Sequence, residues 1–138
     1  MERFQSVMHE ETQMFSHVFV GANDIAASKK FYDAALAALG VPEGKADPKG
    51  RIFYRTKTGM FGLTKPIDGK AACHANGGTI GFAAASPEQV KAFHDAGVAN
   101  GGKSIEDPPG WRDNGPVKLY LAYLRDPDGN KICAMHRG

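Results

Sequence analysis

The sequence is poor in the features that mark membrane, secreted and nucleic-acid-binding proteins. It has no apolar stretch long enough to span a bilayer, and its first residues contain no apolar segment of the signal-peptide kind. No basic run or basic-aromatic cluster stands out, and the formal net charge is only +2. We therefore expect no membrane partner, no nucleic-acid partner and, by default, a cytoplasmic location.

Cysteine is also scarce. Cys73 and Cys133 are the only two among 138 residues, and they are far apart in the sequence. Without a secretory signal, such a pair is expected to be two free thiols in a reducing compartment rather than a disulfide. A chain of this length can bury a core without disulfides or structural metals, so we expect a single domain.

The chain contains an internal repeat. Residues 17–40 align without a gap on residues 79–102, and the two segments share seven identities in 24 positions. Each copy has the pattern of a strand followed by a helix. A repeat of this kind predicts one core built from two similar halves.

The first half has the pattern of a strand, a helix and a hairpin. Residues 14–20 are apolar and β-prone, and Asn23 or Asp24 can cap the helix that follows. A Thr-Gly turn signal at 58–59 separates two further strands. The half therefore supplies one helix and about four strands.

The second half repeats this order. A strand is expected at 79–84, and Ser86 is placed to cap a helix with proline at its first position. Residues 108–116 contain so many prolines and glycines that we expect a loop there. Strands at 117–125 and 131–136 follow, joined by a tight turn.

This order predicts an α+β fold. Each helix covers one face of its own half-sheet, so the other faces must be covered differently. Two βαβββ modules that form a cupped, barrel-like mixed sheet, with the helices outside, leave a concave site between them. The expected organisation is a disordered leader at 1–13 and one domain at 14–138, with module one at 14–66, a linker at 67–77 and module two at 78–138.

Three features together resemble the vicinal oxygen chelate superfamily. They are the repeated unit, the Phe-Ser-His-Val strand at 15–18 and the closing motif Arg-Asp-Pro-Asp-Gly-Asn-Lys-Ile at 125–132. The superfamily includes glyoxalase I, extradiol dioxygenases and the bleomycin- and fosfomycin-resistance proteins, and the chain is most similar to its glyoxalase-like bacterial members. The resemblance implies paired βαβββ modules, a divalent metal in the cup and, usually, a homodimer.

The resemblance also implies where metal ligands would lie, on the first and last strands of each module. His17 matches the first ligand, Thr79 takes the place of its counterpart in module two, and Cys133 stands where a glutamate is usual. The fourth position falls at Gly62 or Leu63, and neither side chain can coordinate a metal.

Two interpretations of this ligand set stay open. His17 and Cys133, with His74 from the linker, could form a non-standard site for Zn, Ni, Fe or Mn. Alternatively the chain holds no metal, His17 lines a pocket and Cys133 is a small buried filler. A cysteine nucleophile at Cys133 is a further alternative, although it needs a base or a cation beside it.

The predicted pocket is apolar, with a few polar groups to orient a small organic ligand. If the turn at 126–130 is a type I turn with a glycine bulge, Tyr123 lies opposite Cys133. Trp111 is either a lid carried by the loop at 108–116 or an aromatic plug at the end of the barrel. The candidate pocket residues are His17, Phe19, Thr79, Trp111, Tyr123 and Cys133.

Two functions from different classes follow from this pocket. The first is a metal-dependent lyase, isomerase or dioxygenase of the glyoxalase-like type, with catalytic residues that the sequence does not assign. The second is a metal-free binding protein that sequesters a small molecule such as a drug. A degenerate module that serves as a structural or regulatory dimer is a third.

Overall fold

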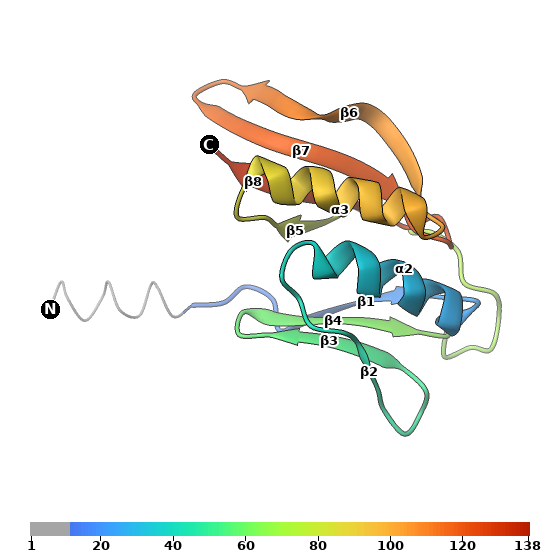
Figure 1. Ribbon diagram of the computed structural model, residues 1–138. Helices are drawn as coiled ribbons and strands as arrows, with labels where there is room; N and C mark the ends of the chain where they lie inside the picture. Colours follow the sequence, from blue (N-terminus) through green and yellow to red (C-terminus); the bar gives the residue numbers. More distant parts are fainter. Residues whose placement is uncertain (1–11) are drawn as a thin grey trace, which may run out of the picture.

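The computed structural model describes residues 12–138 and shows two βαβββ units in succession (Figure 1). Of the leader predicted at 1–13, residues 1–11 lie outside the described part. The first unit contains β1 (His17–Gly21), α2 (Ile25–Ala37), β2 (Lys45–Ala46), β3 (Ile52–Thr56) and β4 (Gly59–Thr64). The second contains β5 (Ile80–Ala83), α3 (Pro87–Ala99), β6 (Lys103–Asn114), β7 (Val117–Arg125) and β8 (Lys131–Arg137).

The strands form two four-stranded mixed sheets of the same topology. Sheet A has the order β1-β4-β3-β2 and sheet B the order β5-β8-β7-β6. In each sheet the first and last strands of the unit pair in parallel, and the other neighbours are antiparallel. The two helices lie side by side between the sheets (Figure 1). The predicted α+β fold of paired βαβββ modules is confirmed, with two curved, open sheets in place of a closed barrel.

The helices keep the spacing of the sequence repeat. Their first residues, Ile25 and Pro87, are 62 positions apart, as are their last residues. The carboxylate of Asp24 accepts a hydrogen bond from the backbone of Ala27, and the hydroxyl of Ser86 accepts one three residues further on. Both side chains satisfy amide groups that a helix start leaves unpaired. Asp24, not Asn23, is thus the cap of α2.

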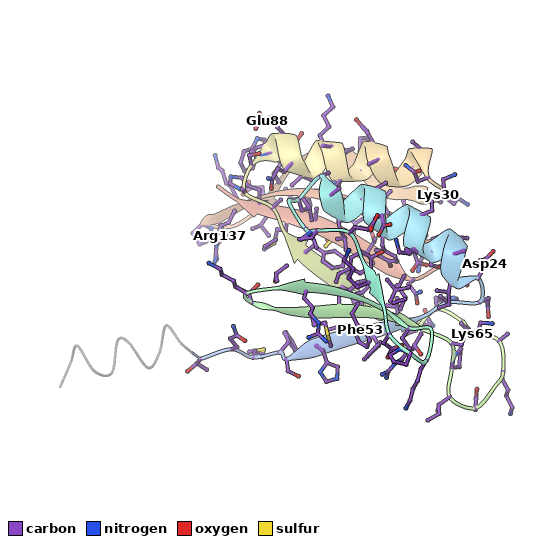
Figure 2. All side chains as sticks on the ribbon, turned by 60° about the horizontal axis from the view of Figure 1, so that its bottom comes forward. Asp24, Lys30, Phe53, Lys65, Glu88 and Arg137 are labelled. Atoms are coloured by element: carbon purple, nitrogen blue, oxygen red, sulfur yellow. The ribbon has the colours of Figure 1, made fainter. Side chains whose placement is uncertain are left out.

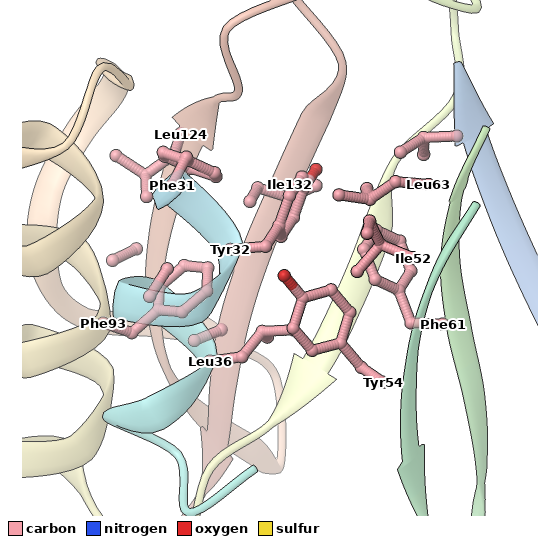
Figure 3. Close-up of a cluster of buried hydrophobic side chains, with 14 of the residues drawn as sticks. Phe31, Tyr32, Leu36, Ile52, Tyr54, Phe61, Leu63, Phe93, Leu124 and Ile132 are labelled. Carbon is pink, nitrogen blue, oxygen red and sulfur yellow. The ribbon is translucent and has the colours of Figure 1, made fainter. Parts of the chain in front are cut away.

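The hydrophobic core lies between the helix pair and the sheets (Figure 3). Phe31 and Phe93 are identical in the two copies of the repeat, and both are fully buried. The rings of Phe61 and Phe82 meet edge to face with centroids 5.2 Å apart and so join the two sheets. Other core members include Tyr32, Leu36, Ile52, Tyr54, Leu63, Leu124 and Ile132.

The closing turn between β7 and β8 is built around the buried carboxylate of Asp126. One carboxylate oxygen accepts hydrogen bonds from the backbone amides of Asp128 and Asn130, both at 2.9 Å. The other accepts from the Tyr32 hydroxyl at 2.7 Å and from the Asn130 amide at 2.9 Å. Burial, together with Asp126, raises the pKa of Tyr32, so its hydroxyl stays a donor.

The same turn is bonded to the first unit at further points. Asp128 accepts a hydrogen bond from the backbone of Asn23 at 3.0 Å and one from the Ser28 hydroxyl at 3.1 Å. The Asn130 amide donates to the carbonyl of Gly21 at 3.2 Å. The motif that closes the sequence is therefore an inter-module clamp, which we define as Asp126, Asp128, Asn130 and their partners.

The sequence predicts a loop at 108–116, and this prediction is wrong. Most of the segment belongs to β6, which pairs with β7 along its length except for a register shift between Ile105 and Gly110. Both prolines lie in this irregular stretch of an edge strand, where a missing amide leaves no ladder bond broken. The breakers therefore mark a bulge inside a strand.

Arg112 holds this bulge together. Its guanidinium donates to the carbonyls of Asp107, Pro108 and Gly110 at 3.0 to 3.1 Å. Glu106, at the start of the bulge, has a φ of 60°, which is unusual for a residue other than glycine. A single arginine thus replaces the ladder bonds that the strand lacks here.

Candidate functional site

Each sheet has one face toward the helices and one face without helices. Because strand side chains alternate, Val18 and Val20 point into the core while His17 and Phe19 point the opposite way. We call the second side of both sheets the helix-free face. Its members include His17, Phe19, Phe53, Arg55, Met60 and Gly62 in sheet A, and Gly81, Ala83, Leu121, Tyr123, Cys133 and Met135 in sheet B.

A pocket of about 300 Å³ lies where one end of β1 approaches β5. Both modules contribute to its wall, because residues 15–18 and 80–83 line it together. The apolar lining includes Val18, Leu36, Val41, Tyr54, Phe61 and Phe82, and the polar lining includes Ser16, His17, Thr56 and Thr58. A mostly apolar cavity with few polar groups is the usual form of a small-molecule site.

His17 is exposed at the mouth of this pocket and is held in place by two neighbours. Its Nδ1 atom lies 2.8 Å from the hydroxyl oxygen of Ser16, and its ring contacts Phe19 edge-on at 5.7 Å. The imidazole is therefore oriented, and its other nitrogen is directed away from Ser16. An oriented imidazole at a pocket mouth can donate to or accept from a bound ligand.

Gly62 makes room for the aromatic ring of Phe19. Phe19 and Phe53 flank Gly62 on the neighbouring strands of sheet A. A β-carbon at Gly62 would lie 2.4 Å from a ring carbon of Phe19, so only glycine leaves space for this ring. Phe19 consequently reaches across the strand to Phe53, with ring centroids 5.5 Å apart.

The corresponding part of sheet B has a buried thiol instead of a ring. Cys133 pairs with Tyr123 as the sequence predicts, and Gly81 lies on its other side. Burial raises the pKa of Cys133 to about 11, despite the opposing effect of Lys131. The thiol is protonated at neutral pH, which makes it a weak nucleophile.

The candidate residues from the sequence fall in different places. His17 lines the 300 Å³ pocket, whereas Phe19 and Thr79 line a second pocket of about 240 Å³ at the other end of β1. Tyr123 and Cys133 lie together on the helix-free face of sheet B. Three of the six candidates thus line pockets where the two sheets approach each other, and two more lie on the helix-free face of sheet B.

Trp111 lies apart from the other five. It sits on β6 opposite Tyr120, against whose ring it packs edge to face at 5.3 Å. Tyr120 packs on the core, so Trp111 is on the helix side of sheet B and not on the helix-free face. The segment that the sequence predicts to be a loop with Trp111 as a lid is strand β6.

Sequence reasoning missed several residues that line the pocket. Met60 and Thr56 come from the hairpin of β3 and β4, and Val41 comes from the segment after α2. The alternation of apolar and polar residues in the hairpin could have placed Met60 on the helix-free face. No local signal pointed to Val41, because only packing brings it to β5.

The likeness to known proteins agrees with this geometry. The family model described as Glyoxalase/Bleomycin resistance protein/Dioxygenase superfamily matches residues 14–134. The chain belongs to this superfamily. None of the curated proteins compared with the chain matches it.

Among the solved structures that resemble the chain, one is similar in sequence and fold, and two are similar in fold alone. A glyoxalase/bleomycin resistance protein from Albidiferax ferrireducens T118 is 63% identical, with a TM-score of 0.88 over 91% of this chain and 100% of that one. A family enzyme from Burkholderia phytofirmans PsJN is 18% identical, with a TM-score of 0.64 over 88% and 96%. A glyoxalase-related enzyme from Fulvimarina pelagi is 20% identical, with a TM-score of 0.66 over 91% and 88%. The last two share the fold.

Members of the superfamily often use divalent metals, and the pairing of strands shows which residues stand at the ligand positions here. Gly62 pairs with Phe19 as Cys133 pairs with Gly81, so Gly62 is the counterpart of Cys133. Leu63 is fully buried in the core. The fourth ligand position, which the sequence placed at Gly62 or Leu63, is therefore at Gly62.

This set of donors does not fit a metal held by one chain. Among residues 12–138, no group of three or more histidine, cysteine or acidic side chains is arranged to hold one. His74 packs beside Gly129, near the end of β1 that is opposite His17. A five-residue strand spans roughly 13 Å, so His74 does not join His17 in a ligand group.

Proposed function

We propose that this superfamily member binds a small organic molecule in the 300 Å³ pocket between β1 and β5. The observation that supports this function is the pocket itself, which both modules line with apolar side chains and which has His17 at its mouth. Its size suits a small aromatic or aliphatic compound. Binding without a metal is the function that this arrangement of residues supports best.

Pocket filling tests the proposal. Val41→Trp places a large ring in the pocket, while Val98→Trp makes the same change on α3, where Val98 is 44% exposed. A set of small aromatic and aliphatic fragments is screened by ligand-observed NMR. We expect fragments that bind the wild type to bind the Val98 variant equally and to lose binding to the Val41 variant. Equal binding by all three proteins would place the site elsewhere.

The alternative from the sequence is a metal-dependent lyase, isomerase or dioxygenase. It would need donors beyond His17 and Cys133, since no group of three or more potential ligands is arranged for a metal among residues 12–138. Elemental analysis of protein purified without chelator tests it directly. Near-stoichiometric Zn, Ni, Fe or Mn that disappears in His17→Ala would favour this alternative over metal-free binding.

We also propose, from the family resemblance, that the protein is a homodimer, and we keep the cytoplasm as its default location. No helix among residues 12–138 is long and apolar enough to cross a membrane. Sedimentation velocity of the purified protein tests the oligomeric state, and fractionation of cells that express it tests the location.

A further inference from the structure

We propose that the helix-free face of sheet A is a second binding site, at which Phe19, Phe53 and Arg55 hold a small aromatic anion such as an aryl carboxylate. This inference goes beyond the proposed function, because none of these three residues lines the 300 Å³ pocket. It depends on an aromatic surface and on a cation beside it that has no acidic partner among the described residues.

The aromatic surface is formed by Phe19 and Phe53 on the helix-free face of sheet A. Both rings are partly exposed, and they meet edge to face across Gly62. Partly exposed rings on a solvent-facing sheet offer both a flat face and an edge to a planar ligand. Aromatic pairs of this kind contribute beyond the area they bury.

The cation is the guanidinium of Arg55, whose carbon atom lies 5.6 Å from the centre of the Phe53 ring. Arg51 also lies near this ring, at 5.1 Å, but its charge is paired with Asp47 at 2.6 Å. Arg55 takes part in no ion pair among the described residues. Its planar fork is therefore free for a carboxylate.

The register of sheet A places this cation on the same face as the two rings, in line with His17. His17 pairs with Met60 on β4, and Met60 pairs with Arg55 on β3, so the three residues form one row on the helix-free face. His17 and Met60 also line the pocket. The helix-free face and the pocket therefore adjoin at His17 and Met60, while Arg55 itself does not line the pocket.

Basic side chains predominate on the rest of the helix-free face. Strand alternation and register place on it Lys45, Arg55, Arg112, Arg125, Lys131 and Arg137. Lys45 is paired with Glu43, and Lys131 is paired with Glu106. The four arginines take part in no ion pair among the described residues, so the face has a net positive charge, which favours anions over cations.

Three probes with one ring system and different charges test the ligand class. They are 2-naphthoate, neutral 2-naphthamide and the cation of 2-(aminomethyl)naphthalene, titrated into the full chain by calorimetry at low salt. We expect naphthoate to bind about tenfold more tightly than the amide, because a charge-assisted hydrogen bond exceeds about 1.4 kcal/mol. We expect the cation to bind most weakly.

A pair of charge-matched variants locates the effect. Arg55→Gln should weaken naphthoate binding about tenfold and leave the amide within about twofold. Lys30→Gln removes one positive charge from the helix layer, away from Phe53 (Figure 2), and should leave all three affinities unchanged. An equal loss in both variants would mean that only net charge matters, which would overturn the assignment to Arg55.

The outcomes separate this inference from the proposed function. If the amide or the cation binds as well as naphthoate, the anion class is wrong and a small-molecule site is still supported. If no probe binds and the fragment screen is also negative, both proposals fail. If Phe53→Ser converts a wild-type dimer into monomers, the face is a subunit interface and the ligand assignment is overturned.

Discussion

The two modules share a core design and differ on the helix-free face. In module one the pair at the centre of this face is Phe19 and Gly62, and in module two it is Gly81 and Cys133. Positions 19 and 81 correspond in the repeat. The larger residue of the pair is therefore on the first strand of module one but on the last strand of module two. The core faces stay alike because both must pack on a helix. The helix-free faces do not pack on a helix, so they are free to diverge.

The hairpin turns of the two modules differ as well. The turn between β3 and β4 is short, since Thr56 pairs directly with Gly59. The turn between β7 and β8 is longer, since Arg125 pairs with Lys131, and it forms the inter-module clamp. Only the second turn bonds to the other module's helix among the described residues. The pseudo-symmetry of the chain is therefore broken at the point where the halves are held together.

Removing the clamp should produce the largest effect. Asp126→Ala leaves the Tyr32 hydroxyl and the Asn130 amide without their buried acceptor, and we expect the free energy of unfolding to fall by about 3 kcal/mol. Thr58→Ala in the corresponding turn of module one should change it by less than about 0.5 kcal/mol. Urea denaturation followed by fluorescence measures both. Similar losses in the two variants would show that the clamp contributes no more to stability than the turn of module one.

Replacing Gly62 and Gly81 by alanine should show that the helix-free face of module one tolerates an added methyl group less well than that of module two. In Gly62→Ala the new carbon meets the Phe19 ring at 2.4 Å, and we expect a loss of about 1 to 2 kcal/mol as the ring is displaced. In Gly81→Ala it meets the Cys133 sulfur at 3.3 Å, and the change should stay within about 0.5 kcal/mol. Thermal unfolding of both variants checks the order. A larger loss for Gly81→Ala would contradict it.

The last effect, which is absent at neutral pH and appears only in alkaline solution, concerns the buried thiol of module two. Because the pKa of Cys133 is raised to about 11, the unfolded chain loses this proton at lower pH than the folded one. The stabilisation is present below the ordinary pKa of 9.0 and is lost as the pH rises toward 11. Between these values the wild type should lose up to about 2 kcal/mol more than Cys133→Ala does, because each pKa unit corresponds to about 1.4 kcal/mol. Urea titrations at pH 8, 9.5 and 11 would show parallel curves if the thiol is not buried.

Much of the fold could be predicted from local sequence. Strand and helix periods, the caps at Asp24 and Ser86 and the offset of 62 residues all reflect short-range chemistry. The loop predicted at 108–116 was wrong because proline and glycine report only on the local backbone. They do not tell whether a strand is an edge strand, where a bulge can hold them.

The candidate site could be predicted only in part. His17 was a candidate because of the family resemblance, and the pairing of Tyr123 with Cys133 followed from one assumed turn. The sequence did not reveal that Phe19 rests over Gly62 or that Arg55 and Met60 continue the row from His17. These neighbours come from different strands, and their pairing depends on register.

The sequence by itself determined that two similar strand-helix units build the core, because burial patterns repeat with the periods of helix and strand. It also determined the clamp motif, whose aspartates and asparagine fit a tight turn. Only the tertiary structure decided which faces meet, where the pocket opens and which residues neighbour Arg55. These depend on distances between residues that are far apart in the chain, and such distances are fixed only when the two sheets and the helix pair pack together.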